Sequence, residues 1–376
     1  MIELQEGVVP EINHEQPYAI VAITKHGVAL ARELHEKFSA SDVYYMAKFE
    51  QGDEAEKGIQ LFTGTVRLLL PALFKSYKGL LLIISIGAVV RMIAPILKDK
   101  MTDPGVVVID DRGHYAISVL SGHMGGANEL AREAAAVIGA EPVITTASDV
   151  QKTIPVDLFG ARFGWTWESS EKLTPVSAAV VNEEEVAVVL ETGERNWWMY
   201  DTPMPPNLKV FSSVKEALAA KPAAALLVTD RLLEPEENQL LVNGVLYRPK
   251  SIVLGMGCNR GTPAEEIEQL INETLSELKL SKQSVKALCT IDLKKDEQGF
   301  LDVSQKYGWD FVTYSPAELN AVPIQEPSET VFKFTGAFGV SEPAVICFAG
   351  ETALLLPKKK AKNATISVAR LTFEEE

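Results

Sequence analysis

A histidine stands within a glycine-rich segment, residues 121–128, which reads Ser-Gly-His-Met-Gly-Gly-Ala-Asn. The apolar, β-branched run 115–120 before it predicts a strand, and the run 129–138 after it has the spacing and residue types of a helix. The segment is therefore expected at the carboxyl end of a strand, where glycines can take positive φ angles and amides at a helix N-terminus can bind an anion. His123 changes charge near neutral pH, which favours a general acid or base here. The structural alternative is a close-packed turn in which His123 only forms hydrogen bonds.

A second glycine-rich segment, residues 255–262 (Gly-Met-Gly-Cys-Asn-Arg-Gly-Thr), follows a predicted strand at 252–254. Thr262 is a suitable N-cap for the next helix, with Pro263 at the first helical position and Glu265 completing a capping box. The glycine spacing differs from the dinucleotide-binding GxGxxG pattern, and no P-loop lysine follows. A nicotinamide site and an ATP site are therefore both disfavoured.

Strands and helices alternate along the chain, which predicts an α/β fold with open, mostly parallel sheets and flanking helices in the N- and C-terminal parts. The N-terminal strands are expected at 18–23, 42–49, 80–86, 106–110, 115–120 and 141–146, and the helices at 27–38, 66–74, 89–97 and 129–138. Later strands are expected at 186–190, 223–229, 240–247, 252–254, 286–291, 310–313 and 364–369, with a helix at 342–349. We predict three domains: an N-terminal α/β domain (1–149), a small α/β middle domain (150–250) and a C-terminal α/β domain (251–376).

Composition narrows the partners and the compartment. A formal net charge of −15 disfavours nucleic acid and anionic membranes as partners, because both need a basic face. The three cysteines are widely spaced without a metal-ligand pattern, and the first residues do not resemble a signal peptide, so we expect a cytoplasmic protein without a zinc site. Charged and helix-breaking residues interrupt the apolar run 80–97, so it is not predicted to span a membrane. The Lys358–Lys360 run is interpreted as a solvated turn, and the Trp197–Trp198 pair as part of a local core rather than a platform for a flat ligand.

Several motifs, taken together and in order, resemble the CbiG family of cobalt-precorrin-5A hydrolases over nearly the whole chain. The matching stretches are 63–67, 87–95, 121–128, 142–149, 255–262, 290–297 and 339–344. The resemblance implies an enzyme that opens the δ-lactone on ring A of cobalt-precorrin-5A and releases the C20 carbon with its methyl group as acetaldehyde, giving cobalt-precorrin-5B on the anaerobic route to adenosylcobalamin. It implies a tetrapyrrole as the small-molecule partner, transient contacts with other pathway enzymes at most, and no cofactor, since the substrate carries the cobalt.

Two alternatives remain open. The first is a non-catalytic protein that binds or transfers a corrinoid, and the second is an α/β enzyme acting on a phosphorylated small molecule. An assay for acetaldehyde released from cobalt-precorrin-5A separates all three.

The candidate catalytic residues are His123 and Glu342, the latter being either a second base or a carboxylate that favours the start of a helix. Amides of Gly125 and Gly126 are candidates for an oxyanion hole, and Asn128 for orienting the histidine or a water. The carboxylates of the substrate need local positive charge despite the net charge, and arginines such as Arg91 and Arg260 can supply it unless they serve structural ion pairs. The expected substrate-binding residues are Gly64, Arg67, Gly87, Arg91, Ser121, Gly122, Gly125, Gly126, Asn128, Thr145, Thr146, Gly257, Asn259 and Arg260. We expect the two glycine-rich segments to open into one cleft.

Overall fold

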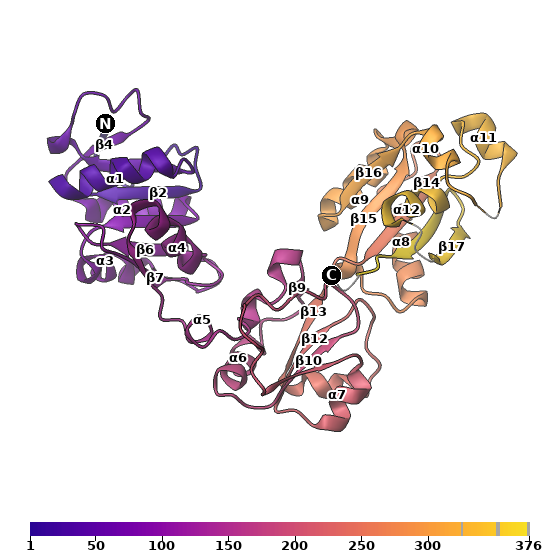
Figure 1. Cartoon of the computed structure of the whole chain (residues 1–376). Coiled ribbons are helices and arrows are strands. Elements are labelled where there is room, and N and C mark those ends of the chain that lie inside the picture. Colours follow the sequence, from indigo (N-terminus) through magenta and orange to yellow (C-terminus); the bar gives the residue numbers. More distant parts are fainter. Residues whose placement is uncertain (325, 351–353, 374–376) are drawn as a thin grey trace. The chain divides into compact units, whose positions relative to one another are not determined.

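The computed structural model describes residues 1–324, 326–350 and 354–373. They form three mixed, mostly parallel open sheets flanked by helices, which confirms the predicted fold class (Figure 1). The chain divides into two compact units, Met1–Leu158 and Phe159–Glu376, and the second contains two of the three sheets. No helix among the described residues is long and apolar enough to cross a membrane.

The first unit is built on an eight-stranded sheet in the order β1-β4-β3-β2-β5-β6-β7-β8. Its strands are β1 (Ile2–Glu3), β2 (Tyr18–Ala22), β3 (Ser41–Met46), β4 (Gln60–Thr63), β5 (Gly79–Ile83), β6 (Gly105–Ile109), β7 (Tyr115–Leu120) and β8 (Glu141–Val143). Its helices are α1 (Lys25–Lys37), α2 (Val66–Ser76), α3 (Ile86–Ile93), α4 (Ala127–Ile138) and α5 (Ala147–Gln151). Helices α1 and α4 pack on one face of the sheet, and α2 and α3 on the other. Burial on both faces explains why β5 and β6 are continuous apolar runs.

The strand direction changes once within this sheet, between β6 and β7. β1 to β6 are parallel to their neighbours, but β7 runs antiparallel to β6, so that Leu120 lies opposite Val106. The segment after β7 therefore lies beside the amino end of β6, where a Cβ on Gly105 would be 2.4 Å from the carbonyl oxygen of Gly125. The chain enters α1, α2 and α3 at the opposite edge of the sheet, where β2, β4 and β5 have their carboxyl ends. The sequence predicted β7 but not its direction.

The second unit contains two five-stranded sheets, β11-β10-β12-β13-β9 and β16-β15-β14-β18-β17. The first comprises β9 (Thr166–Trp167), β10 (Val186–Leu190), β11 (Leu208–Phe211), β12 (Ala224–Val228) and β13 (Gly244–Arg248), with helices α6 (Leu173–Val181) and α7 (Val214–Ala220). The second comprises β14 (Ile252–Cys258), β15 (Val285–Ile291), β16 (Asp310–Tyr314), β17 (Leu354–Lys360) and β18 (Ala364–Arg370). Its helices are α8 (Ala264–Glu277), α9 (Gln298–Tyr307), α10 (Pro316–Asn320), α11 (Glu329–Thr335) and α12 (Ser341–Ala349). The hairpin β17–β18 joins β14 in antiparallel pairing, while β14, β15 and β16 are parallel.

Several local predictions for this unit were wrong. The lysine run 358–360 is part of strand β17 and not a turn. Residues 240–243 belong to a 3-10 helix, Glu237–Asn243, and not to a strand. The capping box is absent, because Pro263 occupies the N-cap position of α8 and the hydroxyl of Thr262 instead donates to the carbonyl of Asn259 at 2.8 Å.

The tandem tryptophans form ring contacts within the second unit. Trp197 lies edge-on to Phe159 at 5.4 Å between ring centroids, and Trp198 lies edge-on to Tyr200 at 5.2 Å. These contacts fit the interpretation of the pair as part of a local aromatic core.

Candidate active site

The imidazole of His123 is held between two carboxylates. Its Nε2 lies 2.9 Å from Oδ2 of Asp149, and its Nδ1 lies 2.9 Å from Oδ1 of Asp157. Asp149 is part of α5, and Asp157 belongs to the 3-10 helix Val156–Leu158 that ends this unit. All three side chains are mostly buried, with 16% of the His123 side chain exposed. The histidine therefore ties its loop to the segment that follows β8.

This geometry fixes the charge of the histidine. Hydrogen bonds to Asp149 and then Asp157 raise the pKa of His123 to about 9, against the lowering effect of burial. Burial would raise the pKa of Asp149, but hydrogen bonds from His123 and Arg132 bring it below its usual value. At neutral pH the site thus holds an imidazolium cation, which can donate a proton but cannot accept one.

Asn128 supports the same cluster from the first turn of α4. Its Nδ2 donates to Oδ2 of Asp149 and to Oγ1 of Thr146, both at 3.0 Å, and its Oδ1 accepts from the hydroxyl of Ser118 at 2.8 Å. Only 3% of the residue is exposed. Asn128 therefore orients Asp149 directly and the histidine through it. Thr145 and Thr146 lie beside this cluster because β8 is parallel to β7.

The amides at the start of α4 are largely occupied by the loop itself. The N–H of Gly126 donates to the carbonyl of His123 at 2.9 Å, and the next two amides donate to the carbonyls of Ser121 and Gly122 at 3.1 and 3.0 Å. The amide of Gly126, one of the two expected oxyanion donors, is therefore already bonded. This arrangement agrees with the structural interpretation of the turn.

The glycines of this loop serve close packing more than unusual backbone angles. Only Gly126 has a positive φ, at 78°. A Cβ at Gly125 would lie 2.3 Å from the Cβ of Ser121, and one at Gly122 would lie 2.6 Å from Oδ1 of Asn128. Of the three glycines expected to be able to take positive φ angles, Gly126 does so, and the other two are required for lack of space.

The structure separates the predicted N-terminal site into two groups. Gly64, Arg67, Gly87 and Arg91 follow the carboxyl ends of β4 and β5, at the sheet edge opposite the His123 loop. At that edge the guanidinium of Arg91 donates to the carbonyl of Gly87 at 2.9 Å. These residues therefore lie at the other edge of this sheet from His123, because the antiparallel direction of β7 sends its loop there.

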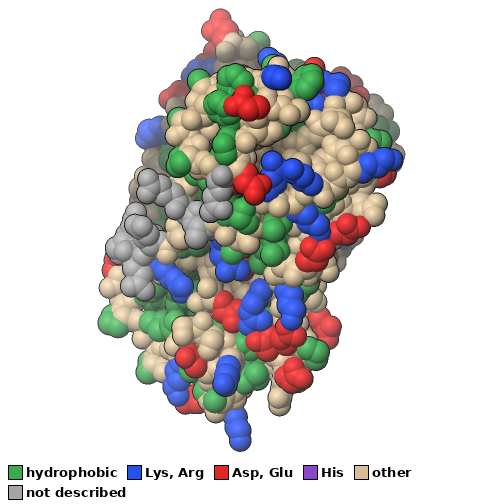
Figure 2. Space-filling view, turned by 90° about the vertical axis from the view of Figure 1, so that its right-hand side faces the viewer, with side chains coloured by type: hydrophobic (Ala, Val, Ile, Leu, Met, Phe, Trp, Pro, Cys, Tyr) green, Lys and Arg blue, Asp and Glu red, His purple; other side chains and the backbone are tan. Residues whose placement is uncertain are grey.

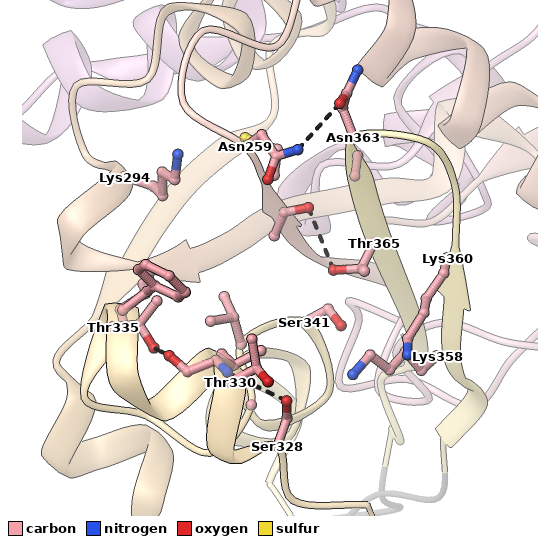
Figure 3. A pocket seen from close by; sticks show the side chains of 18 of the residues that line it. Asn259, Lys294, Ser328, Thr330, Thr335, Ser341, Lys358, Lys360, Asn363 and Thr365 are labelled. Carbon is pink, nitrogen blue, oxygen red and sulfur yellow. Dashed lines mark hydrogen bonds between the residues drawn. The ribbon is translucent and has the colours of Figure 1, made fainter.

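A cavity of about 1080 Å³ lies at the carboxyl ends of β14 and β15 in the C-terminal sheet (Figure 3). Three predicted binding residues line it: Gly257, Asn259 and Arg260. The amide of Asn259 donates to the side chain of Asn363 at 3.1 Å, which joins the β14 turn to the β17–β18 hairpin. This edge is where open α/β sheets usually bind ligands.

The basic side chains nearest the β14 turn are engaged by carboxylates. Arg260 lies 2.7 Å from Asp296, although 58% of its side chain is exposed. Glu297, of which only 2% is exposed, accepts from the amide of Gly261 at 2.7 Å and from Lys294 at 2.9 Å. The carboxylate of Glu297 thus holds the shape of the turn.

Glu342 follows Ser341 in the first turn of α12. Ser341 lines the cavity, whereas Glu342 is not among the described lining residues. A carboxylate at this position is stabilised by the positive end of the helix dipole, which agrees with the structural alternative for Glu342.

Sequence reasoning gave no role to four residues that these sites contain. Asp149 and Asp157 were not separable from other acidic residues, because only the fold brings them to His123. Lys358 and Lys360 line the cavity, and the charged run at 358–360 did not indicate the strand that carries them there.

Family models and known proteins of cobalamin synthesis match this chain over most of its length. Three family models match the chain: "Cobalamin synthesis G N-terminal" at 69–149, "Cobalamin biosynthesis central region" at 154–249 and "Cobalamin synthesis G C-terminus" at 252–369. The chain is 65% identical over 374 residues to the cobalt-precorrin-5A hydrolase of Priestia megaterium, covering 100% of each protein. It is 30% identical to the cobalt-precorrin-5A hydrolase of Salmonella typhimurium, covering 87% of this chain and 90% of that protein. Among solved structures, a cobalamin biosynthesis protein G homolog from Sulfolobus solfataricus is 19% identical, with 94% of this chain and 96% of that chain covered and a TM-score of 0.36.

Proposed function

The chain belongs to the CbiG family, and we propose that it catalyses the reaction that membership implies, as a cobalt-precorrin-5A hydrolase of cobalamin biosynthesis. The observation that carries this function is the 65% identity over the full length of the Priestia megaterium enzyme. In the proposed reaction, water opens the δ-lactone on ring A, and the C20 carbon then leaves with its methyl group as acetaldehyde. The product is cobalt-precorrin-5B, and the cobalt ion is part of the substrate throughout.

We propose that His123 handles the proton in this reaction. Ring opening breaks an ester-like C–O bond, and the oxygen that leaves needs a proton, which an imidazolium can donate. Its raised pKa, about 9, supports the acid as the starting state. The neutral imidazole left behind can then take the hydroxyl proton back as the bond between C20 and the macrocycle breaks and acetaldehyde forms. Both ring nitrogens are hydrogen-bonded to carboxylates, so one of these two bonds must open for an N–H to reach the substrate oxygen, while the other keeps the ring oriented.

Replacement of His123 tests this role. His123→Ala should lower the rate of acetaldehyde release from cobalt-precorrin-5A by at least about a hundredfold, the lower range for general acid–base catalysis. His114→Ala is the control, because 72% of the His114 side chain is exposed. Near-normal release by a folded His123→Ala protein would remove His123 from the mechanism.

A second variant separates catalysis from a structural role. Asp157→Asn keeps the bond from Nε2 to Asp149 but removes one of the two interactions that raise the pKa of His123. The pH at which activity declines on the alkaline side should therefore move toward neutrality in this variant. A purely structural role for His123 would lower thermal stability without moving the pH profile of the rate.

The remaining sequence assignments stay proposals. We propose Arg67, Arg91 and Arg260 as carboxylate contacts and Glu342 as a second base. We also propose a cytoplasmic location, no resident cofactor and, at most, transient contacts with other pathway enzymes. The three domains 1–149, 150–250 and 251–376 are supported by the family regions, each of which lies within one of them.

A further inference from the structure

We propose that Lys358 and Lys360 bind carboxylates of the tetrapyrrole substrate in the C-terminal cavity, and that Phe334 covers an apolar face of the same ligand. The identity of the ligand rests on the proposed function. The inference that the cavity accepts an anionic, amphipathic ligand rests on the residues that line it.

Strand β17 is irregular between Leu356 and Lys359, so the direction of each lysine is given by its contacts rather than by simple alternation. Lys358 and Lys360 reach into the cavity, as Figure 3 shows. Lys359 instead forms an ion pair with Glu277 at the end of α8, at 2.7 Å. One lysine of the run is therefore structural, and two are presented to the cavity.

Some of the basic side chains that line the cavity are paired with carboxylates, and others are not. Arg260 and Lys294 also line it, but each is paired with a carboxylate of the segment that follows β15, Arg260 with Asp296 and Lys294 with Glu297. Lys358 and Lys360 form no ion pair with any residue that the structure describes, and neither does Lys362, which lines the cavity from the exposed turn between β17 and β18. Two lining carboxylates, Glu326 and Glu329, are the opposing charges. Lys358 and Lys360 are therefore the strand cations available to an anionic ligand, with Lys362 as a third cation in the adjoining turn.

The charge of the rest of the chain does not favour the binding of a polycarboxylate. The chain carries a formal net charge of −15, which opposes the approach of a polycarboxylate. On the face drawn in Figure 2, basic side chains are interspersed with acidic ones and do not form a broad basic surface. Local cations inside a cavity, rather than the overall field, must therefore attract the ligand.

The cavity also offers an apolar surface. Phe334 lines it with 81% of the residue exposed, whereas Phe332 on the same helix stacks on Phe338 at 4.4 Å between ring centroids. An aromatic ring exposed in a cavity gains free energy when a flat ligand covers it. The volume of about 1080 Å³ lies just above the roughly 300–1,000 Å³ that small-molecule sites span, which suits a large ligand.

Binding of a stable tetrapyrrole tests the site without requiring turnover. Uroporphyrin carries carboxylates around its whole rim, so we expect wild-type protein to bind it and Lys358→Gln/Lys360→Gln to bind it about tenfold or more weakly. Lys359→Gln is the matched control on the same strand and should change the Kd less than about twofold. Phe334→Ala should also weaken binding. Coproporphyrin, with fewer carboxylates, should bind more weakly than uroporphyrin and should depend less on the lysines.

The acetaldehyde assay distinguishes the two proposals. If both hold, the double lysine variant should show a raised KM with kcat largely retained. Lysine-dependent uroporphyrin binding by a protein that releases no acetaldehyde would refute the hydrolase proposal and leave the anion site. Two results together would overturn the lysine site alone. The first is acetaldehyde release by the double lysine variant with an unchanged KM. The second is uroporphyrin binding that is either undetectable in all the proteins or equally strong in Lys359→Gln and in the double variant.

Discussion

At the scale of single residues, the most informative group is an imidazole with both ring nitrogens bonded to carboxylates. A histidine that exchanges a proton with a substrate needs one ring nitrogen free, whereas His123 has Asp149 and Asp157 on either side at 2.9 Å, so one of the two bonds must open for catalysis. The resulting cation explains why a chain with many acidic residues can bury two of them here. It also means that a change in the protonation of His123 is a change in how firmly its loop is attached.

This attachment predicts a pH dependence of stability. The pKa of His123 is higher in the folded protein, about 9, than its ordinary 6.5, so the stabilisation is fully present below about pH 6.5 and is lost as pH rises through about 9. The largest effect that such a rise in pKa allows is about 3 kcal/mol. Urea unfolding of wild-type protein should show the loss across this window, and His123→Gln should lack it. Parallel pH curves for the two proteins would contradict the assignment of the cation to His123.

At the scale of elements, strand direction decides which residues meet. Because β7 is antiparallel to β6, its loop lies at the amino end of β6, and the turns after β4 and β5 lie at the other edge. In the C-terminal sheet, antiparallel pairing instead brings a segment to the carboxyl ends of the parallel strands. β18 runs antiparallel to β14 and β17 runs antiparallel to β18, so β17 has the same direction as β14 and its last residues, the lysines, lie at the carboxyl end of β14.

The close contact between β14 and α12 depends on a glycine. A Cβ at Gly255 would lie 1.9 Å from the carbonyl oxygen of Ser341, whereas one at Gly257 would lie 3.0 Å from the hydroxyl of Thr365. Gly255→Ala should therefore force α12 away from the sheet and lower the free energy of unfolding by about 2 to 3 kcal/mol. Gly257→Ala is the comparison and should cost less than about 1 kcal/mol, because a side-chain hydroxyl can move. Equal stabilities of the two variants in chemical denaturation would show that the contact is not limiting.

At the scale of the whole molecule, the contacts that join the middle and C-terminal sheets include one buried carboxylate. Asp230, 2% exposed, accepts from Arg370 at 2.9 Å and from Ser251 at 2.7 Å, and its carbonyl accepts from the amide of Ser281 at 2.7 Å. Asp230 precedes the predicted domain boundary near residue 250, and its partners follow it. The two sheets should therefore unfold together.

Asp230→Ala tests this coupling. Removing one partner of a buried ion pair usually costs about 3 to 5 kcal/mol, and here amide exchange should accelerate in both β12 and β14. Glu234→Gln removes a pair with Lys279 in which both side chains are largely exposed, so it should change stability by less than about 1 kcal/mol. Acceleration confined to β12 would mean that the middle sheet unfolds on its own.

The sequence alone determined the fold class, most strand and helix positions and the family. These depend on local periodicity, on helix-forming residues and on motifs that are read along the chain, and so the runs at 79–83, 105–109 and 127–138 were recognisable without any partner. The expectation that the two glycine-rich segments share one cleft stays a prediction.

Only the tertiary structure decided which side chains meet. The pairing of His123 with Asp149 and Asp157, the separation of Arg91 from that cluster, and the turning of Lys358 and Lys360 toward a cavity all depend on strand order and direction. These properties come from hydrogen bonds between segments far apart in the chain, and local residue patterns carry little information about them. The amino acids that can do the chemistry are therefore visible in the sequence, whereas their neighbours are set by how the sheets assemble.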